Sequence, residues 1–139
     1  MRALLAAVVA LLLCGSAAAE TVRFRPVDVY VDSGAEPLAA YQVEITARGA
    51  VIAGVEGGDP PAFAEAPHYD PAALQGGRII LAAFNTGGDL PHGRTRVATL
   101  HMRESGNADY VIKLTAAATA AGARIEARAS VEPREGERR

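Results

Sequence analysis

The chain has 139 residues, with 14 Lys or Arg against 16 Asp or Glu, which gives a formal net charge of −2 at pH 7. Removal of a predicted leader, which contains Arg2 and is described below, leaves about 120 residues with a net charge of about −3. This size suits one domain. This weakly acidic balance gives no electrostatic reason to expect nucleic acid or an anionic membrane as a partner.

Residues 1–19 have the pattern of a secretory signal peptide. Arg2 supplies a positive start, residues 4–13 are apolar, and Ala17 to Ala19 form a small-residue cleavage site. The apolar stretch has about half of the roughly 20 residues that a membrane-spanning helix needs. We therefore predict cleavage after Ala19 and a secreted or periplasmic protein with no membrane attachment after cleavage.

Cys14 offers an alternative, because bacterial lipoproteins are cut just before a cysteine that then carries lipid. The preceding residue is Leu13, where that processing uses Gly, Ala or Ser, so the lipoprotein interpretation is the weaker one. If Cys14 leaves with the signal peptide, the mature domain has no thiol and no disulfide.

Apolar residues occupy every second position in 27–31 and in 41–45, with Asp28, Tyr30, Gln42 and Glu44 between them. Side chains alternate between the two faces of a strand, so this pattern predicts sheets with one buried and one wet face. Eight segments have strand character: 21–31, 38–47, 51–55, 66–69, 78–84, 96–102, 110–115 and 124–131. They predict an all-β domain over residues 20–132, an antiparallel jelly-roll β-sandwich of about eight to nine strands.

The segments between these strands are rich in turn residues. Asp70 and Pro71 predict one helical turn, and the Ala-rich stretch 116–123 is interpreted as a hairpin that turns near Ala121 and Gly122. Residues 133–139 carry charges and no large apolar side chain, so they are predicted to form a disordered charged tail.

The sequence predicts no enzyme. Ser33, Ser105 and Ser130 lie in turns or near the terminus and not in a nucleophile elbow. The sequence does not rule out the paired carboxylates of a glycosidase, because their separation is a three-dimensional property. The candidates are interpreted as residues of a wet strand face or a strand end: Glu44, Glu56, Glu104 and Glu126.

A metal site is the alternative that the loops suggest. His68, Asp70, Asp89 and His92 would form it if their loops converged, as in a small extracytoplasmic metal-dependent protein or enzyme. Structural calcium at Asp59 or Asp89 has no supporting motif, so no cofactor is predicted.

Aromatic residues limit the carbohydrate ligands that the domain would bind. The chain has no Trp, and most of its Phe and Tyr residues are placed like core residues, whereas Tyr30 has outward parity. A binding face for crystalline polysaccharide is therefore not expected, while a loop-lined site for a soluble glycan stays open.

Four stretches in order resemble the cohesin family, which is related to carbohydrate-binding-module-like sandwiches: VDVYVDSGAEPLAAYQVEITA (27–47), AVIAGVEGGDPPAF (50–63), GGRIILAAFNTG (76–87) and TRVATLHMRESG (95–106). The resemblance implies a nine-strand jelly roll without catalytic residues, whose flat sheet face docks a dockerin-type module. An Asn-x-Asp pair that helps cohesins hold their partner corresponds to Ala40 and Gln42 here. The candidate partner contacts are Gln42, Glu44, Arg78 and Asn85.

The leading interpretation is a secreted, non-catalytic, cohesin-like recognition module in extracellular polysaccharide binding or breakdown. Its partner would be a protein of dockerin type or a glycan, bound through one sheet face and its loops. Besides the metal-dependent alternative, a structural subunit of an envelope assembly that pairs through edge strands also fits the pattern.

Overall fold

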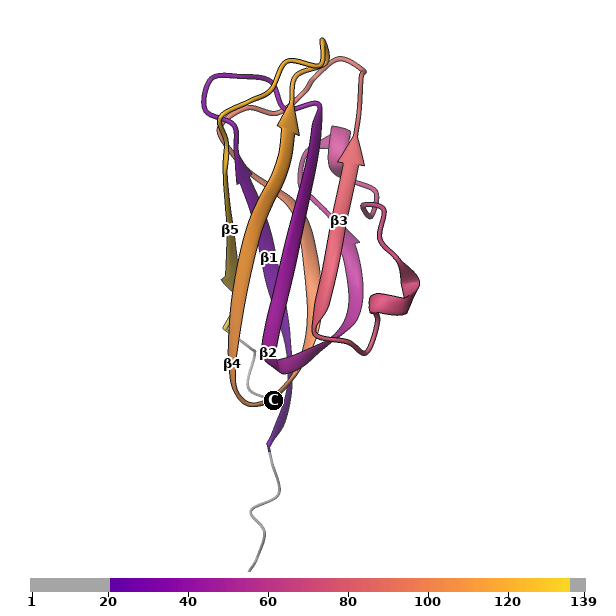
Figure 1. Ribbon diagram of the computed structural model, residues 1–139, viewed down its shortest axis with the longest axis vertical. Coiled ribbons are helices and arrows are strands. Elements are labelled where there is room, and N and C mark those ends of the chain that lie inside the picture. Colours follow the sequence, from indigo (N-terminus) through magenta and orange to yellow (C-terminus); the bar gives the residue numbers. More distant parts are fainter. Residues whose placement is uncertain (1–20, 136–139) are drawn as a thin grey trace, which may run out of the picture.

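All five strands of the structure belong to one antiparallel sheet with the order β3-β2-β4-β1-β5 (Figure 1). The computed structural model describes residues 21–135, so the predicted signal peptide and the end of the charged tail lie outside the described residues. The strands are β1 (Val22–Asp32), β2 (Ala40–Gly57), β3 (Arg78–Phe84), β4 (Arg94–Ala118) and β5 (Arg128–Pro133). Two 3-10 turns, η1 (Pro61–Phe63) and η2 (Pro71–Ala73), interrupt the connection from β2 to β3. The predicted all-β antiparallel class is confirmed, and no helix in the described range is long and apolar enough to cross a membrane.

The structure has five strands where eight to nine were predicted, because two pairs of predicted strands are continuous. β2 contains the predicted segments 38–47 and 51–55 in large part, and β4 contains 96–102 and 110–115. Segment 66–69 contributes only an isolated bridge between His68 and Ala82. Segment 124–131 divides into a bridge from Arg124 to Ala118 and the strand β5.

The two long strands bend side by side at glycines. The register between β2 and β4 shifts between Arg48 and Ala50, and the residue between them, Gly49, has φ +72°. A Cβ atom at Gly49 would lie 2.4 Å from the carbonyl oxygen of Asn107 on β4, so only glycine fits there. On β4, Gly106 has φ +70°. Glycines that resemble turn signals thus mark bulges inside continuous strands.

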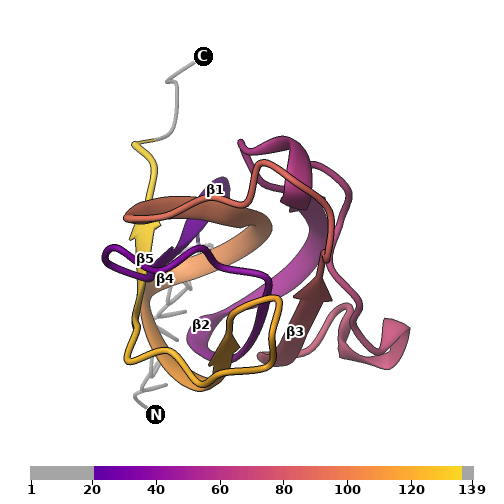
Figure 2. The ribbon, with the colours of Figure 1, turned by 90° about the horizontal axis from the view of Figure 1, so that it is seen from above.

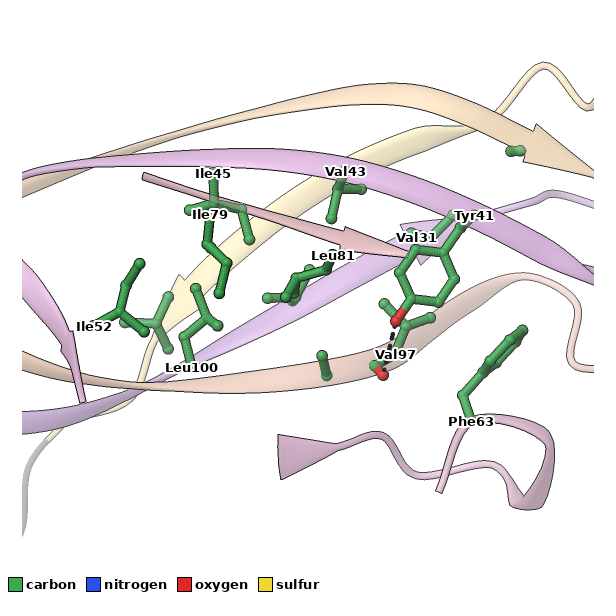
Figure 3. Packing of buried hydrophobic residues seen from close by; sticks show 14 of the residues in the cluster. Val31, Tyr41, Val43, Ile45, Ile52, Phe63, Ile79, Leu81, Val97 and Leu100 are labelled. Atoms are coloured by element: carbon green, nitrogen blue, oxygen red, sulfur yellow. Dashed lines mark hydrogen bonds between the residues drawn. The ribbon is translucent and has the colours of Figure 1, made fainter. Parts of the chain in front are cut away.

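The bends fold the sheet over its own hydrophobic core. Viewed along the long axis, the sheet curls so that residues 40–48 of β2, β3 and residues 109–118 of β4 lie across from β1 and the first half of β4 (Figure 2). The Tyr41 hydroxyl donates a hydrogen bond across the core to the Val97 carbonyl oxygen at 3.4 Å (Figure 3). The core includes Val27, Val29, Val31, Leu38, Tyr41, Val43, Ile45, Ile52, Phe63, Ile79, Leu81, Val97, Leu100 and Met102.

The predicted alternation is confirmed in 41–45, but in 27–31 it is wrong for Asp28, which is buried because Thr99 and Arg134 bond its carboxylate. Val43 is fully buried, Gln42 is exposed and Glu44 is partly exposed. Two local predictions are also confirmed. The carboxylate of Asp70 caps η2 by accepting a hydrogen bond from the Ala72 amide at 2.9 Å, and the chain reverses after β4 in a turn that contains Gly122, with φ +82°.

Candidate functional site

Three of the four predicted contact residues lie together on one exposed sheet face. In the register of β2, Gln42 is opposite Ala82, and Glu44 is opposite Ile80 on one side and Lys113 on the other. We call this surface the outer face. It consists of Ala40, Gln42, Glu44 and Thr46 on β2, Arg78, Ile80, Ala82 and Phe84 on β3, and Val111, Lys113 and Ala116 on β4.

Large apolar side chains are unusually exposed on this face. Ile80, Phe84 and Val111 are 38%, 71% and 67% exposed, and they are three of the five large hydrophobic residues exposed within 21–135. The others, Val22 and Phe24, lie at the start of β1. The expectation that most aromatic residues lie in the core is therefore wrong for Phe24 and Phe84. Both rings belong to side chains whose strand parity points them away from the core.

Glu44 and Arg78 form an ion pair on the outer face, with the Arg78 Nε atom 3.0 Å from Glu44 Oε1. The hydrogen bond from Arg78 holds the pKa of Glu44 below its usual value, and the nearby charge of Lys113 acts in the same direction. Exposed ion pairs of this kind add little to stability. The two side chains are thus free to exchange this contact for one with another molecule.

Asn85 does not join the outer face. It follows β3, where its Nδ2 atom donates to the Ala62 carbonyl oxygen at 3.2 Å and its Oδ1 atom accepts from the Gly87 amide at 2.7 Å. These bonds attach the loop after β2 to the end of β3. Asn85 thus anchors the loop at the end of β3.

A pocket of about 310 Å³ opens at the end of the outer face. Residues 61–63 and 65–68 of the loop after β2 line it, together with residues 83–85 at the end of β3, and we call it the Phe84 pocket. The loop lies along the free side of β3 (Figure 1). The Phe84 side chain belongs to both the outer face and this pocket, so the two surfaces are continuous.

The opposite side of the molecule carries a chain of polar contacts that the sequence analysis did not find. Arg134 binds the Asp28 carboxylate through Nε at 2.8 Å and Nη2 at 2.7 Å, and the Thr99 hydroxyl donates to Asp28 at 2.7 Å. Arg96 extends the chain to Thr99 at 2.6 Å and to Asp59 at 2.6 Å. Burial opposes the charge of Asp28, but the bonds from Arg134 and Thr99 outweigh it and lower its pKa. The side chains of this polar chain are thus bonded to one another.

Tyr30 is also on this side, and its outward parity does not make it a free platform. The guanidinium of Arg94 lies 3.6 Å from the centre of the Tyr30 ring, which is a cation–π contact. Arg94 also pairs with Glu132 on β5. The ring is covered by the protein's own arginine.

The start of the predicted disordered tail is part of this ordered surface. Pro133 ends β5, and the Arg134 amide donates to the Pro26 carbonyl oxygen at 2.9 Å. The ordered domain thus extends past the predicted boundary at residue 132.

Glu104 closes one end of the core and is fully buried, so its interpretation as a residue of a wet strand face is wrong. Its carboxylate accepts hydrogen bonds from Arg23 at 2.8 Å, Arg25 at 3.2 Å and the Tyr110 hydroxyl at 2.5 Å. Burial disfavours the charged carboxylate, but the bonds from Tyr110, Arg23 and Arg25 together lower the pKa of Glu104. All these contacts are internal, which indicates a structural role.

The four residues of the metal alternative are not gathered into a site. Within residues 21–135, no group of three or more His, Cys, Asp or Glu side chains is placed to hold a metal ion. Asp70 caps η2, and His68 exchanges two backbone hydrogen bonds with Ala82. The calcium candidate Asp59 is paired with Arg96.

Comparison of the chain with models of known protein families, with curated proteins and with solved structures finds no match. The cohesin resemblance therefore stays a prediction.

Proposed function

We propose that this chain is an exported, non-catalytic recognition module that binds a protein partner through the outer face. The observation that carries the proposal is the gathering of Ile80, Phe84 and Val111 on one face, interspersed with the charged pair of Glu44 and Arg78. Exposed apolar side chains on one face, with charged neighbours between them, are typical of surfaces that bind other macromolecules. On the opposite side Val22 and Phe24 are exposed at the start of β1, but Arg94, Arg96 and Arg134 are already paired with carboxylates of the chain itself.

A protein partner fits this surface better than a glycan. Glycans on flat sheets stack on aromatic platforms, but the outer face has only one aromatic ring among the described residues, that of Phe84. Its other two exposed large apolar side chains are aliphatic. Ile80 and Val111 instead suit the apolar side chains of a protein interface. Glu44, Arg78 and Lys113 supply charges of both signs that would set the partner's orientation.

The strands alone are too small for a standard interface, so the partner must also contact loops. With seven residues in β3, a rise of about 3.3 Å per residue and a strand spacing of about 4.8 Å, three strands cover roughly 330 Å² in projection. A standard interface buries about 800 Å² on each partner. The Phe84 pocket at one end and the hollow lined by Thr46, Arg48, Asp109 and Val111 at the other extend the surface.

The proposal includes a jelly-roll arrangement of cohesin type and a partner such as a dockerin-type module. The folding of one sheet into two facing halves supports the jelly-roll arrangement, because each half of β2 and of β4 would correspond to one strand of a sandwich. Gln42 lies on the exposed side of β2, and by the resemblance it corresponds to a position that contacts the partner in cohesins.

Capture of partners from the secreted fraction of the source cells tests the proposal. We expect the purified protein to retain a protein, and Val111→Lys to reduce its capture at least fivefold, because a lysine at this apolar position loses burial against the partner and stays unpaired. Val22→Lys is the matched control, since Val22 is also exposed but lies on β1 away from the outer face. It should leave capture unchanged.

Two results would overturn the proposal. The first is a failure of the capture experiment, in which either no protein is retained or Val111→Lys retains as much as wild type. The other is that a panel of immobilised glycans binds the protein and Val111→Lys abolishes that binding, which would assign the outer face to a glycan.

A further inference from the structure

We infer that the Phe84 pocket receives a basic side chain, Lys or Arg, from the partner that docks on the outer face. This inference rests on the proposed function and adds the chemistry of one anchoring contact. It follows from the position, the rigidity and the charge of the pocket.

The pocket is held open by contacts on three sides. Phe63 in its wall packs edge-to-face on Tyr41 of the core, with 5.3 Å between ring centres. Asn85 holds the carbonyl oxygen of Ala62, and His68 is bonded to the backbone of β3. A pocket that exists before binding costs less ordering entropy when a side chain enters it.

The pocket has the electrostatic character of a cation site. Glu65 is its single acidic lining residue, it is exposed, and within residues 21–135 no basic side chain forms an ion pair with it. Pro61 and Pro67 in the same wall have no amide hydrogen, so two backbone donors are missing from it. Both features favour a ligand that donates hydrogen bonds and carries positive charge.

The exposed ring of Phe84 favours the same ligand. An aromatic face attracts a cation through its quadrupole, and the molecule already uses this contact on its other side, where Arg94 covers Tyr30. No corresponding internal cation covers Phe84, whose side chain remains 71% exposed within the described chain. A partner's Lys or Arg would take that place.

Other occupants fit less well. An acidic side chain would lie beside Glu65, and a purely apolar one would remove water from the Glu65 carboxylate without replacing its hydrogen bonds. A volume of about 310 Å³ has room for one side chain or one small ring. A single sugar ring is therefore the competing occupant for the test.

Amide chemical-shift titration of the purified protein tests the inference with four small probes: N-acetyl-lysine amide, N-acetyl-arginine amide, N-acetyl-glutamate amide and methyl glucoside. We expect the lysine and arginine probes to shift residues 61–68 and 83–85, and the other two to leave them unchanged. Glu65→Gln and Phe84→Ala should each weaken the basic probes about threefold.

The matched controls are Glu36→Gln, an exposed carboxylate in the turn after β1, and Phe24→Ala, a ring that is 68% exposed on β1. Neither should change the titration. The inference is overturned if the basic probes shift nothing at the pocket, if the glutamate probe shifts it equally, or if only the glucoside does.

Partner capture separates this inference from the proposed function. If Val111→Lys abolishes capture while Glu65→Gln and Phe84→Ala leave it intact, the anchoring contact is wrong and the recognition module stands. If none of the three variants lowers capture, both ideas fail.

Discussion

The Glu104 cluster gives the sharpest prediction about stability. Glu104→Gln keeps the shape of the side chain and an oxygen that can accept from Tyr110, but it removes the charge that binds Arg23 and Arg25. The carboxylate is fully buried, so water does not replace it. The two guanidinium groups would then share the end of the core without a counter-charge.

The structure sets the expected size of the effect. Removing one partner of a buried ion pair costs about 3–5 kcal/mol. The side chain of Arg23 is 51% exposed and that of Arg25 is 19% exposed, so Arg23 can turn to water and recover part of this cost. We therefore expect a loss of about 2–3 kcal/mol, which is about a quarter of the stability typical of a domain of this size.

Urea unfolding measures this loss. The chain has four Tyr and no Trp, so tyrosine fluorescence and far-UV circular dichroism are suitable signals. The midpoint should fall while the slope with urea stays the same, because the area exposed on unfolding is unchanged. Glu36→Gln, at an exposed turn position, is the control and should stay within about 0.5 kcal/mol of wild type.

The pH dependence supplies an independent check. The pKa of Glu104 is lowered in the folded chain, so its contribution to stability is present above the unfolded pKa of about 4.3 and is lost as pH falls through the folded value. The difference between wild type and Glu104→Gln should thus narrow in acid. A difference below about 0.5 kcal/mol at neutral pH, or one that stays constant in acid, would refute the reasoning.

Two further predictions concern single contacts. Arg134→Ala should destabilise the fold by about 1–2 kcal/mol, because Asp28 loses both bonds from the half-exposed guanidinium. The melting temperature should then fall by about 4–8 °C. An unchanged melting temperature would mean that the tail does not hold β5. Gly58→Ala should lower the free energy of unfolding in urea by about 3 kcal/mol, because its Cβ would lie 2.2 Å from the Arg96 carbonyl oxygen. Gly88→Ala is the control and should be nearly neutral, because its Cβ meets nothing within 4 Å. Equal effects of the two substitutions would contradict the close packing at Gly58.

Strand positions and their inner and outer faces could be predicted from the sequence because parity is a local property. The alternation around Val43 and Gln42 predicted correctly which side chains are buried. The number of strands could not be predicted in the same way. Gly49 and Gly106 lie in segments that resemble turns in the sequence. Whether such a glycine forms a turn that ends a strand or a bulge that bends it depends on the neighbouring backbone in the folded sheet.

The candidate site was predictable to the same extent. Parity placed Gln42 and Glu44 on one strand face, and the resemblance to cohesins added Arg78, but neither indicated that Phe84 is exposed, since an aromatic residue in an apolar segment is interpreted as core. The pairing of Arg134 with Asp28 joins residues that are 106 positions apart. No local pattern in the sequence contains such a contact.

The continuity of β2 and β4 through their bends has a kinetic consequence. Each half of the sheet contains a part of both strands, and the pairs inside each half join segments that are far apart in the sequence, such as Ala40 with Ala118 and Val27 with Leu100. Closing contacts between distant segments costs chain entropy before those contacts stabilise anything, and proteins built in this way fold on a scale of milliseconds to seconds. We expect a newly made chain to acquire its two halves in one slow, all-or-none event, without a separately stable hairpin to begin it.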